Sequence, residues 1–212
     1  MRRLPVYLLL DTSSSMTGEP IEQVKNGVQM LVSSLRKDPY ALETAFLSVI
    51  TFDSTANQVV PLTELVNFQV PDLNANGVTA MGEALSLAKQ KADQEVTKSS
   101  AEVKGDWKPM VFIMTDGLPT DDLQKGLKEF RQGNWGIVVG CGVDDADTDA
   151  LKQIAGESVV TLSTSDSNSM SAFFKWVSAS ISFGSKSVET VGKDVSGLDE
   201  LPPPPPEINI VV

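Results

Sequence analysis

Three oxygen-bearing side chains, Asp11, Ser13 and Ser15, stand at alternate positions directly after an apolar run near the start of the sequence. In an extended strand, alternate side chains share a face but lie about 6.6 Å apart, at roughly 3.3 Å per residue. They can converge on one ion only if the chain curls after Leu10, and the serines and Thr17-Gly18 suit such a curl. One carboxylate and two hydroxyls present oxygen alone, which favours a hard cation such as Mg²⁺ over zinc or copper.

Two more oxygen-bearing residues occupy comparable places elsewhere in the sequence. Asp116, followed by Gly117, comes directly after the apolar run 109–115, and Thr79 stands just before a helical pattern. Ligands of open α/β sheets bind beyond the carboxyl ends of the strands. Taken singly, Thr79 could be no more than a helix N-cap, and Asp116 with its glycine no more than a turn. Together these positions predict one divalent-cation site, made by Asp11, Ser13, Ser15, Thr79 and Asp116.

The elements that must position these residues are strands and helices in alternation. Short apolar runs rich in β-branched residues predict buried strands at 5–10, 44–52, 109–115, 135–141 and 158–162, with an antiparallel edge strand at 57–62. Apolar residues at spacings of three and four predict helices across 21–35, 81–96, 123–130, 151–154 and 170–181. Strands alternating with helices imply βαβ units. We therefore predict an α/β fold: a doubly wound, Rossmann-like, mostly parallel sheet of six strands with one antiparallel edge strand and helices on both faces.

A second acidic pattern, Asp145, Asp147 and Asp149, raises the alternative of a calcium-binding loop. An EF-hand loop that begins at Asp145 needs glycine at its sixth position and glutamate at its twelfth, where this sequence has Ala150 and Gly156. We therefore interpret the segment as a loop in which one aspartate caps the helix that follows.

After Phe183 the sequence changes character. It becomes polar and loses its periodicity, and five prolines at 202–206 predict a polyproline II rod of about 15 Å before an apolar end. We predict a domain at 1–183 and a polar, proline-rich C-terminal tail at 184–212, which its composition favours as disordered. Two alternatives stay open: the prolines are a ligand for a partner, or the apolar end docks back on the domain.

The net charge and the histidine and cysteine counts disfavour or exclude several kinds of partner and of catalytic site. The formal net charge is −11, from 17 Lys+Arg against 28 Asp+Glu. This balance disfavours nucleic acid or an anionic membrane as the main partner, because both would repel the chain. The absence of histidine excludes Ser-His-Asp and Cys-His catalysis and every histidine-containing zinc site. A single cysteine allows no intramolecular disulfide, and no apolar run approaches the ~20 residues of a membrane helix. We expect a cytoplasmic protein without membrane insertion.

The order and spacing of the oxygen residues resemble a known family, the von Willebrand factor A domains, over roughly residues 4–183. The residues that carry the resemblance are Asp11-x-Ser13-x-Ser15 after a buried strand, a threonine before a helix, and Thr115-Asp116-Gly117 after a central strand. They are similar to the metal-ion-dependent adhesion site of that family.

The resemblance implies a role for each predicted ligand. Ser13, Ser15 and Thr79 would be hydroxyl ligands, and Asp11 and Asp116 would bind the ion directly or through water. The ion would be Mg²⁺, with Mn²⁺ or Ca²⁺ as alternatives. Ser14 departs from the family, which usually has glycine at this position, and this affects the geometry of the loop rather than any ligand.

Segments 3–11, 19–27 and 38–45 resemble more narrowly the TerY group, the von Willebrand A proteins of bacterial tellurite-resistance systems. This resemblance implies a role in tellurite resistance and the stress response. It also implies protein partners among other Ter-system components, with a kinase and phosphatase pair as a further possibility.

The alternative function is a Mg²⁺-dependent phosphohydrolase or phosphotransfer enzyme that uses Asp11. Haloacid dehalogenase-type enzymes also place an aspartate after their first strand, but they need a second acid two residues later, where this chain has Ser13. Neither G-x-G-x-x-G nor a P-loop follows any predicted strand. The sequence therefore predicts a non-enzymatic module whose metal engages an acidic or phosphorylated group of a partner protein.

Overall fold

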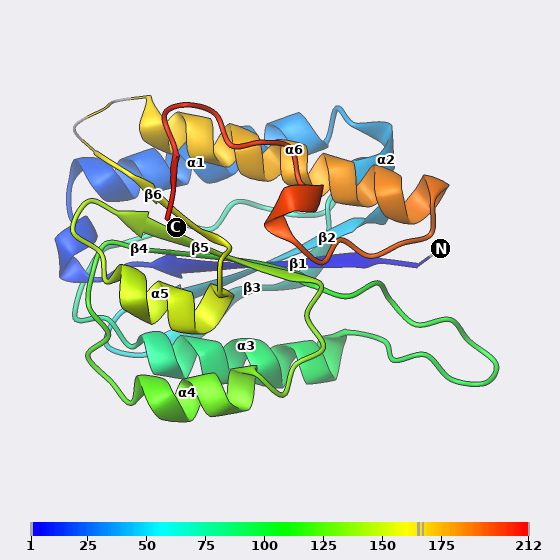
Figure 1. The fold of residues 1–212 in the computed structure, drawn as a ribbon, viewed down its shortest axis with the longest axis horizontal. Helices are drawn as coiled ribbons and strands as arrows, with labels where there is room; N and C mark the ends of the chain where they lie inside the picture. The colour runs from blue at the N-terminus through cyan, green and yellow to red at the C-terminus, as the bar shows by residue number, and fades with distance from the viewer. Residues whose placement is uncertain (1, 165, 167, 212) are drawn as a thin grey trace.

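A mixed β-sheet lies between two layers of helices in the computed structural model, which describes residues 2–164, 166 and 168–211 (Figure 1). Within these residues the sheet has seven strands in the order β3-β2-β1-β4-β5-β6-β7. Their bounds are β1 (Leu4–Asp11), β2 (Ala45–Phe52), β3 (Ala56–Glu64), β4 (Met110–Thr115), β5 (Ile137–Val143), β6 (Val159–Leu162) and β7 (Asn209–Ile210). The pairs from β2 to β6 are parallel, and the two edge strands β3 and β7 are antiparallel to their neighbours.

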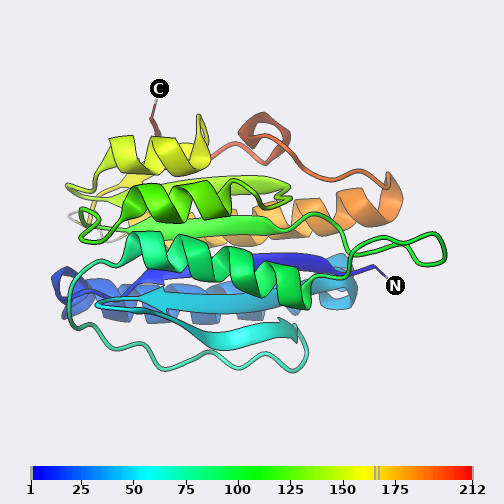
Figure 2. The ribbon, with the colours of Figure 1, turned by 90° about the horizontal axis from the view of Figure 1, so that it is seen from below.

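The helices divide between the two faces of the sheet. Their bounds are α1 (Glu19–Leu35), α2 (Pro39–Thr44), α3 (Met81–Glu95), α4 (Leu123–Phe130), α5 (Thr148–Ala155) and α6 (Ser169–Thr190), with short 3₁₀ turns η1 (Ser14–Met16) and η2 (Leu198–Glu200). Figures 1 and 2 show α1, α2 and α6 on one face and α3, α4 and α5 on the other. Each face therefore has its own apolar core.

Strand β1 shows how the sequence builds both cores at once. All eight of its residues are buried, because parallel neighbours flank it on both sides and helices cover both faces. Successive side chains point to opposite faces, so Leu8 packs in the core under α1 and α6, whereas Tyr7 and Leu9 pack in the core under α3 and α4. The continuous apolar run before Asp11 follows from this two-sided burial.

The predicted fold class is confirmed, and two elements go beyond the prediction. Strand β7 adds a second antiparallel edge strand within the predicted tail. Helix α2 lies between the predicted helix at 21–35 and the predicted strand at 44–52, where no element was predicted. Its N-cap Asp38 accepts a hydrogen bond of 3.0 Å from the N–H of Ala41, and Pro39 occupies its first turn.

The C-terminal residues pack on the domain. Helix α6 runs through the predicted boundary at Phe183 and ends at Thr190. Beyond it, Leu201 and Ile208 are only 6% and 5% exposed, and the indole N–H of Trp176 donates to the carbonyl of Pro202 at 2.7 Å. These contacts agree with the alternative in which the segment docks on the domain, and not with the disorder that its composition favoured. The division of the chain into two units stays a prediction.

No helix among the described residues combines the length and the apolar character that crossing a membrane requires.

Candidate metal site

The first of three loops at the candidate site follows β1, which ends at the buried Asp11. The chain then curls into η1, where the N–H of Met16 donates to the carbonyl of Ser13 at 3.0 Å. The N–H of Ser13 also donates to Oδ1 of Asp11 at 2.8 Å. The curl expected from the serines is therefore present, and the carboxylate of Asp11 points into it.

The second loop leads into α3 and is hydrogen-bonded to the first. The N–H of Ser14 donates to the carbonyl of Gly77 at 3.1 Å, and the N–H of Asn76 donates to the carbonyl of Thr12 at 2.8 Å. Gly77 has a φ of +72°, and a Cβ added there would lie 2.2 Å from Oγ of Ser54. Ser54 lies in the turn between β2 and β3, so the positive φ and this close approach both favour glycine at the position whose carbonyl contacts the first loop.

The third loop follows β4 and contacts the second. Thr79 and Thr120 exchange two hydrogen bonds: the N–H of Thr79 donates to Oγ1 of Thr120 at 3.1 Å, and the N–H of Thr120 donates to the carbonyl of Thr79 at 2.9 Å. A Cβ added at Gly117 would lie 3.1 Å from Oγ1 of Thr79. The hydroxyl of Thr79 therefore lies directly against the loop that carries Asp116.

Side-chain hydrogen bonds join four of the predicted site residues into one chain. The hydroxyl of Ser15 donates to Oδ1 of Asp116 at 2.7 Å, and the hydroxyls of Ser13 and Ser15 are 2.9 Å apart. Asp11 joins through the N–H of Ser13, and its other oxygen accepts from the hydroxyl of Thr115. The structure thus brings all five predicted residues to the carboxyl ends of β1 and β4.

Burial dominates the electrostatics of Asp11. The residue is only 1% exposed, and loss of solvation raises the pKa of its carboxyl group above the ordinary value. Hydrogen bonds from Ser13 and Thr115 oppose this rise, and the nearby charge of Asp116 adds to it. A carboxylate held in such surroundings gains stability from a bound cation, because the cation replaces lost solvation.

The donor set fits a hard divalent cation. Adjacent ligands of an octahedral ion with bonds of about 2.1 Å lie about 3.0 Å apart, and the serine hydroxyls are separated by 2.9 Å. Two carboxylates balance the charge of a dication. Within the described part of the chain the hydroxyl of Thr79 has no hydrogen-bond partner, so it is available as a ligand. Elsewhere in that part, no three His, Cys, Asp or Glu side chains gather closely enough to share an ion.

Three further residues, none of them predicted as a ligand, shape the site. Thr115 contacts Asp11, and Gly77 and Thr120 hold the loop of Thr79 in place. The Asn76-Gly77 pair is a turn signal that could have indicated a tight loop. The second acidic pattern contains the predicted cap, since the carboxylate of Asp147 accepts from the first N–H groups of α5 at 3.0 Å.

Comparisons with known proteins agree with this architecture. The sequence model of the von Willebrand factor type A domain matches residues 6–176. An uncharacterized protein of Synechocystis sp. is 36% identical over 123 residues, which are 55% of this chain and 26% of that protein. The chain thus spans about a quarter of the curated relative that it matches.

Solved structures with low sequence identity share the fold. A von Willebrand factor type A protein from Catenulispora acidiphila superposes with a TM-score of 0.66 at 20% identity, over 85% of this chain and 43% of that one. The von Willebrand factor domain of the pilus tip protein Mfa5 from Porphyromonas gingivalis has a TM-score of 0.66 at 12% identity, over 86% of this chain and 96% of that one.

A third neighbour is the proximal thread matrix protein 1 of the mussel byssus with a zinc-occupied MIDAS motif, at a TM-score of 0.56 and 19% identity, over 84% of this chain and 46% of that one. Members of the matched family are often metal-dependent protein-binding modules and are generally not enzymes. The match over residues 6–176, together with the shared fold, shows that this chain belongs to the von Willebrand factor type A domain family.

Proposed function

We propose that this chain is a metal-dependent protein-binding module whose cation is held by Asp11, Ser13, Ser15, Thr79 and Asp116. The observation that carries the proposal is the hydrogen-bonded chain of oxygens from Asp11 to Asp116, with the unpartnered hydroxyl of Thr79 beside it. Mg²⁺ is the proposed ion, with Mn²⁺ and Ca²⁺ as alternatives, because all the donors are oxygens.

The proposed partner group is a carboxylate or a phosphoryl group. A bound dication supplies an electrophilic position that an acidic oxygen of a partner can fill. Asp11 is buried, whereas Ser14 and Ser15 are exposed, so the site is accessible from the side of η1. The residues of this chain hold and orient the ion, and the partner contributes the remaining ligand.

The surroundings of the site support binding of a protein. Val78 directly precedes Thr79, and its exposed fraction is 51%. Leu118 directly follows Gly117, and its exposed fraction is 65%. The two hydrogen bonds between Thr79 and Thr120 join the loops that carry these apolar side chains. Exposed apolar residues at the rim of a charged site are typical of a protein interface.

The enzyme alternative has less support. Asp11 is buried, and its two carboxylate oxygens accept hydrogen bonds from the N–H of Ser13 and the hydroxyl of Thr115. Ser13 stands where a general acid would be needed, and a hydroxyl does not supply one at neutral pH.

The biological setting of the proposal is a bacterial tellurite-resistance and stress-response system in the cytoplasm. Support comes from the resemblance of segments 3–11, 19–27 and 38–45 to the TerY group. The proposed partners are other Ter-system proteins and a kinase and phosphatase pair.

The neighbouring serines supply a matched test of this function. Ser15 contacts both Ser13 and Asp116, whereas the hydroxyl of Ser14 makes no hydrogen bond within the described residues. The immobilised wild-type chain, S15A and S14A are incubated with a lysate of the source organism in Mg²⁺ or EDTA. We expect a protein that wild type and S14A retain in Mg²⁺ and that EDTA or S15A releases. Equal retention under all six conditions would contradict a metal-dependent contact.

A further inference from the structure

A cavity of about 340 Å³ opens at the end of the sheet opposite the candidate metal site. Its walls come from the last turns of α3, the segment that leads into β4, and the loop before β5. The side chains that matter for its chemistry are Lys89, Asp93, Lys98, Trp107, Lys108 and Trp135. Its volume is within the range of small-molecule sites, at the low end.

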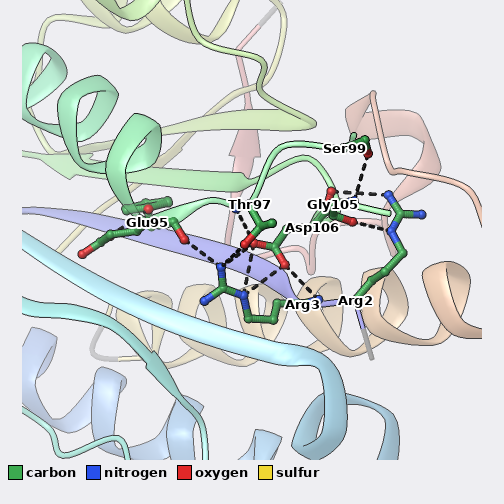
Figure 3. Close-up of polar contacts among 8 residues, drawn as sticks. Arg2, Arg3, Glu95, Thr97, Ser99, Gly105 and Asp106 are labelled. Atoms are coloured by element: carbon green, nitrogen blue, oxygen red, sulfur yellow. Dashed lines mark hydrogen bonds and ion pairs between the residues drawn. The ribbon is translucent and has the colours of Figure 1, made fainter. Parts of the chain in front are cut away.

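One wall of the cavity is fixed by a polar network (Figure 3). The guanidinium of Arg3 donates to both carboxylate oxygens of Asp106, and the N–H of Thr97 donates to the same carboxylate at 2.7 Å. Although burial disfavours the charged carboxylate, these hydrogen bonds hold the pKa of Asp106 below its ordinary value. Arg2 also donates to the carbonyl of Gly105 at 2.6 Å, so the segment before β4 is tied to the start of β1.

Two indole rings contribute to the apolar surface of the cavity. The guanidinium of Arg2 lies 3.5 Å from the centre of the Trp107 ring, and Trp135 stacks on Phe130 with ring centres 4.7 Å apart. The indole N–H of Trp135 already donates to the carbonyl of Phe130 at 2.8 Å. The indole N–H of Trp107 has no partner within the described part of the chain, so it can donate to a ligand.

The residues that line the cavity carry a positive charge on balance, on a chain whose net charge is −11. This balance stays positive when Asp194, which accepts from the backbone N–H of Lys108 at 2.8 Å, and Arg3, which pairs with Asp106, are counted as well. Its lining holds three lysines and two aspartates, and Asp106 is neutralised by Arg3, which is not part of the lining. Lys89 and Lys98 share the single carboxylate of Asp93. The ammonium group of Lys108 forms no ion pair or hydrogen bond within the described residues. An anion would therefore be attracted to this end of an otherwise acidic protein.

We propose that this cavity is a second binding site, for a small planar aromatic molecule that carries one acidic group. The ring packs against Trp107 and Trp135, and the acid meets the ammonium of Lys108 and the free indole N–H. The site lies at the amino-terminal end of β4 and is independent of the proposed metal site.

Three tryptophans allow a direct test, because two line the cavity and Trp176 lies on α6, across the sheet. Indole-3-acetate, the neutral indole-3-acetamide and ring-free acetate are titrated while the indole N–H signals are followed by two-dimensional NMR. We expect the aromatic acid to shift the signals of Trp107 and Trp135 and not that of Trp176. The amide should bind about threefold more weakly, as expected for the loss of one exposed ion pair.

Variants separate the ion pair from general effects of charge. K108Q should make the acid and the amide bind alike, whereas K37Q, which removes an exposed lysine outside the cavity, should keep the preference for the acid. Raising the ionic strength should also reduce that preference. The proposal is overturned if no signal moves, if the signal of Trp176 moves equally, or if wild type binds the acid and the amide alike.

Discussion

Replacing Ser15 by alanine removes one of three proposed hydroxyl ligands with little other damage. The hydroxyl lies 2.7 Å from Oδ1 of Asp116 and 2.9 Å from Oγ of Ser13, at an exposed position. Without metal, loss of such exposed hydrogen bonds should lower the free energy of unfolding by less than about 1 kcal/mol. With metal, the substitution should act mainly on affinity.

The expected size follows from linkage between binding and stability. Mg²⁺ at 100 times its Kd adds about 2.7 kcal/mol to the free energy of unfolding, if it binds only the folded chain. If S15A weakens binding tenfold, the same concentration adds only about 1.4 kcal/mol. For a chain of this size these values correspond to rises in Tm of about 5–11 °C for wild type and about 3–6 °C for the variant.

Thermal unfolding by circular dichroism, with EDTA or with a series of Mg²⁺ concentrations, measures this difference. The control is S14A, because Ser14 neighbours Ser15 and its hydroxyl makes no hydrogen bond within the described residues. It should keep the full response to Mg²⁺. The reasoning is refuted if the Tm of wild type ignores Mg²⁺, or if the two variants lose the response equally.

Three further substitutions, G77A, I208A and D106N, test other parts of the structure, and the first two have control variants. G77A should destabilise the chain by more than about 1 kcal/mol and weaken Mg²⁺ binding, because its Cβ meets Ser54 at a φ of +72°. G156A, at a φ of +63° with free space around it, should cost only the backbone strain, and urea unfolding with and without Mg²⁺ compares the two. I208A should cost about 2–5 kcal/mol in urea unfolding, since Ile208 is buried, whereas I210A at a half-exposed position should cost less than about 0.5 kcal/mol. D106N should lower the free energy of unfolding by about 1–3 kcal/mol at pH 7. Because the pKa of Asp106 is lower in the folded chain, this difference should shrink as the pH falls below about 4, in urea unfolding at several pH values.

Each of these predictions has a result that would contradict it. Equal metal responses in the two glycine variants would show that the loop contact at Gly77 does not support the site. Equal effects of the two isoleucine substitutions would mean that the C-terminal segment does not pack as described. A constant effect of D106N from pH 7 to acid pH would remove the ion pair as its cause.

Most of the fold could be predicted because its signals are local. The apolar runs and the three-and-four spacings depend on neighbours within one element, and β1 shows the continuous run expected of a strand buried on both faces. The C-terminal segment was harder, since Val195 and Leu201 stand singly among polar residues and prolines, and Ile208 belongs to an apolar end of only a few residues. Their burial depends on a groove made by distant elements, which the sequence pattern does not express.

In the candidate site, too, the features with a local sequence signal could be predicted, and those that depend on distant segments could not. Asp11, Ser13 and Ser15 belong to one short motif, which predicted a shared ion when it was considered together with Thr79 and Asp116. The contacts that hold Thr79 beside Gly117 join loops that are far apart in the sequence, so no local sequence pattern predicts them. The cavity at the other end of the sheet likewise combines residues from three separate segments.

Diffraction from crystals grown with Mn²⁺ would show whether one hard cation binds among the five oxygen ligands. We expect a single strong anomalous peak in contact with the hydroxyls of Ser13 and Ser15 and close to Thr79 and Asp116. A map without a peak at this place, or with these side chains ordered and too far apart to share an ion, would contradict it.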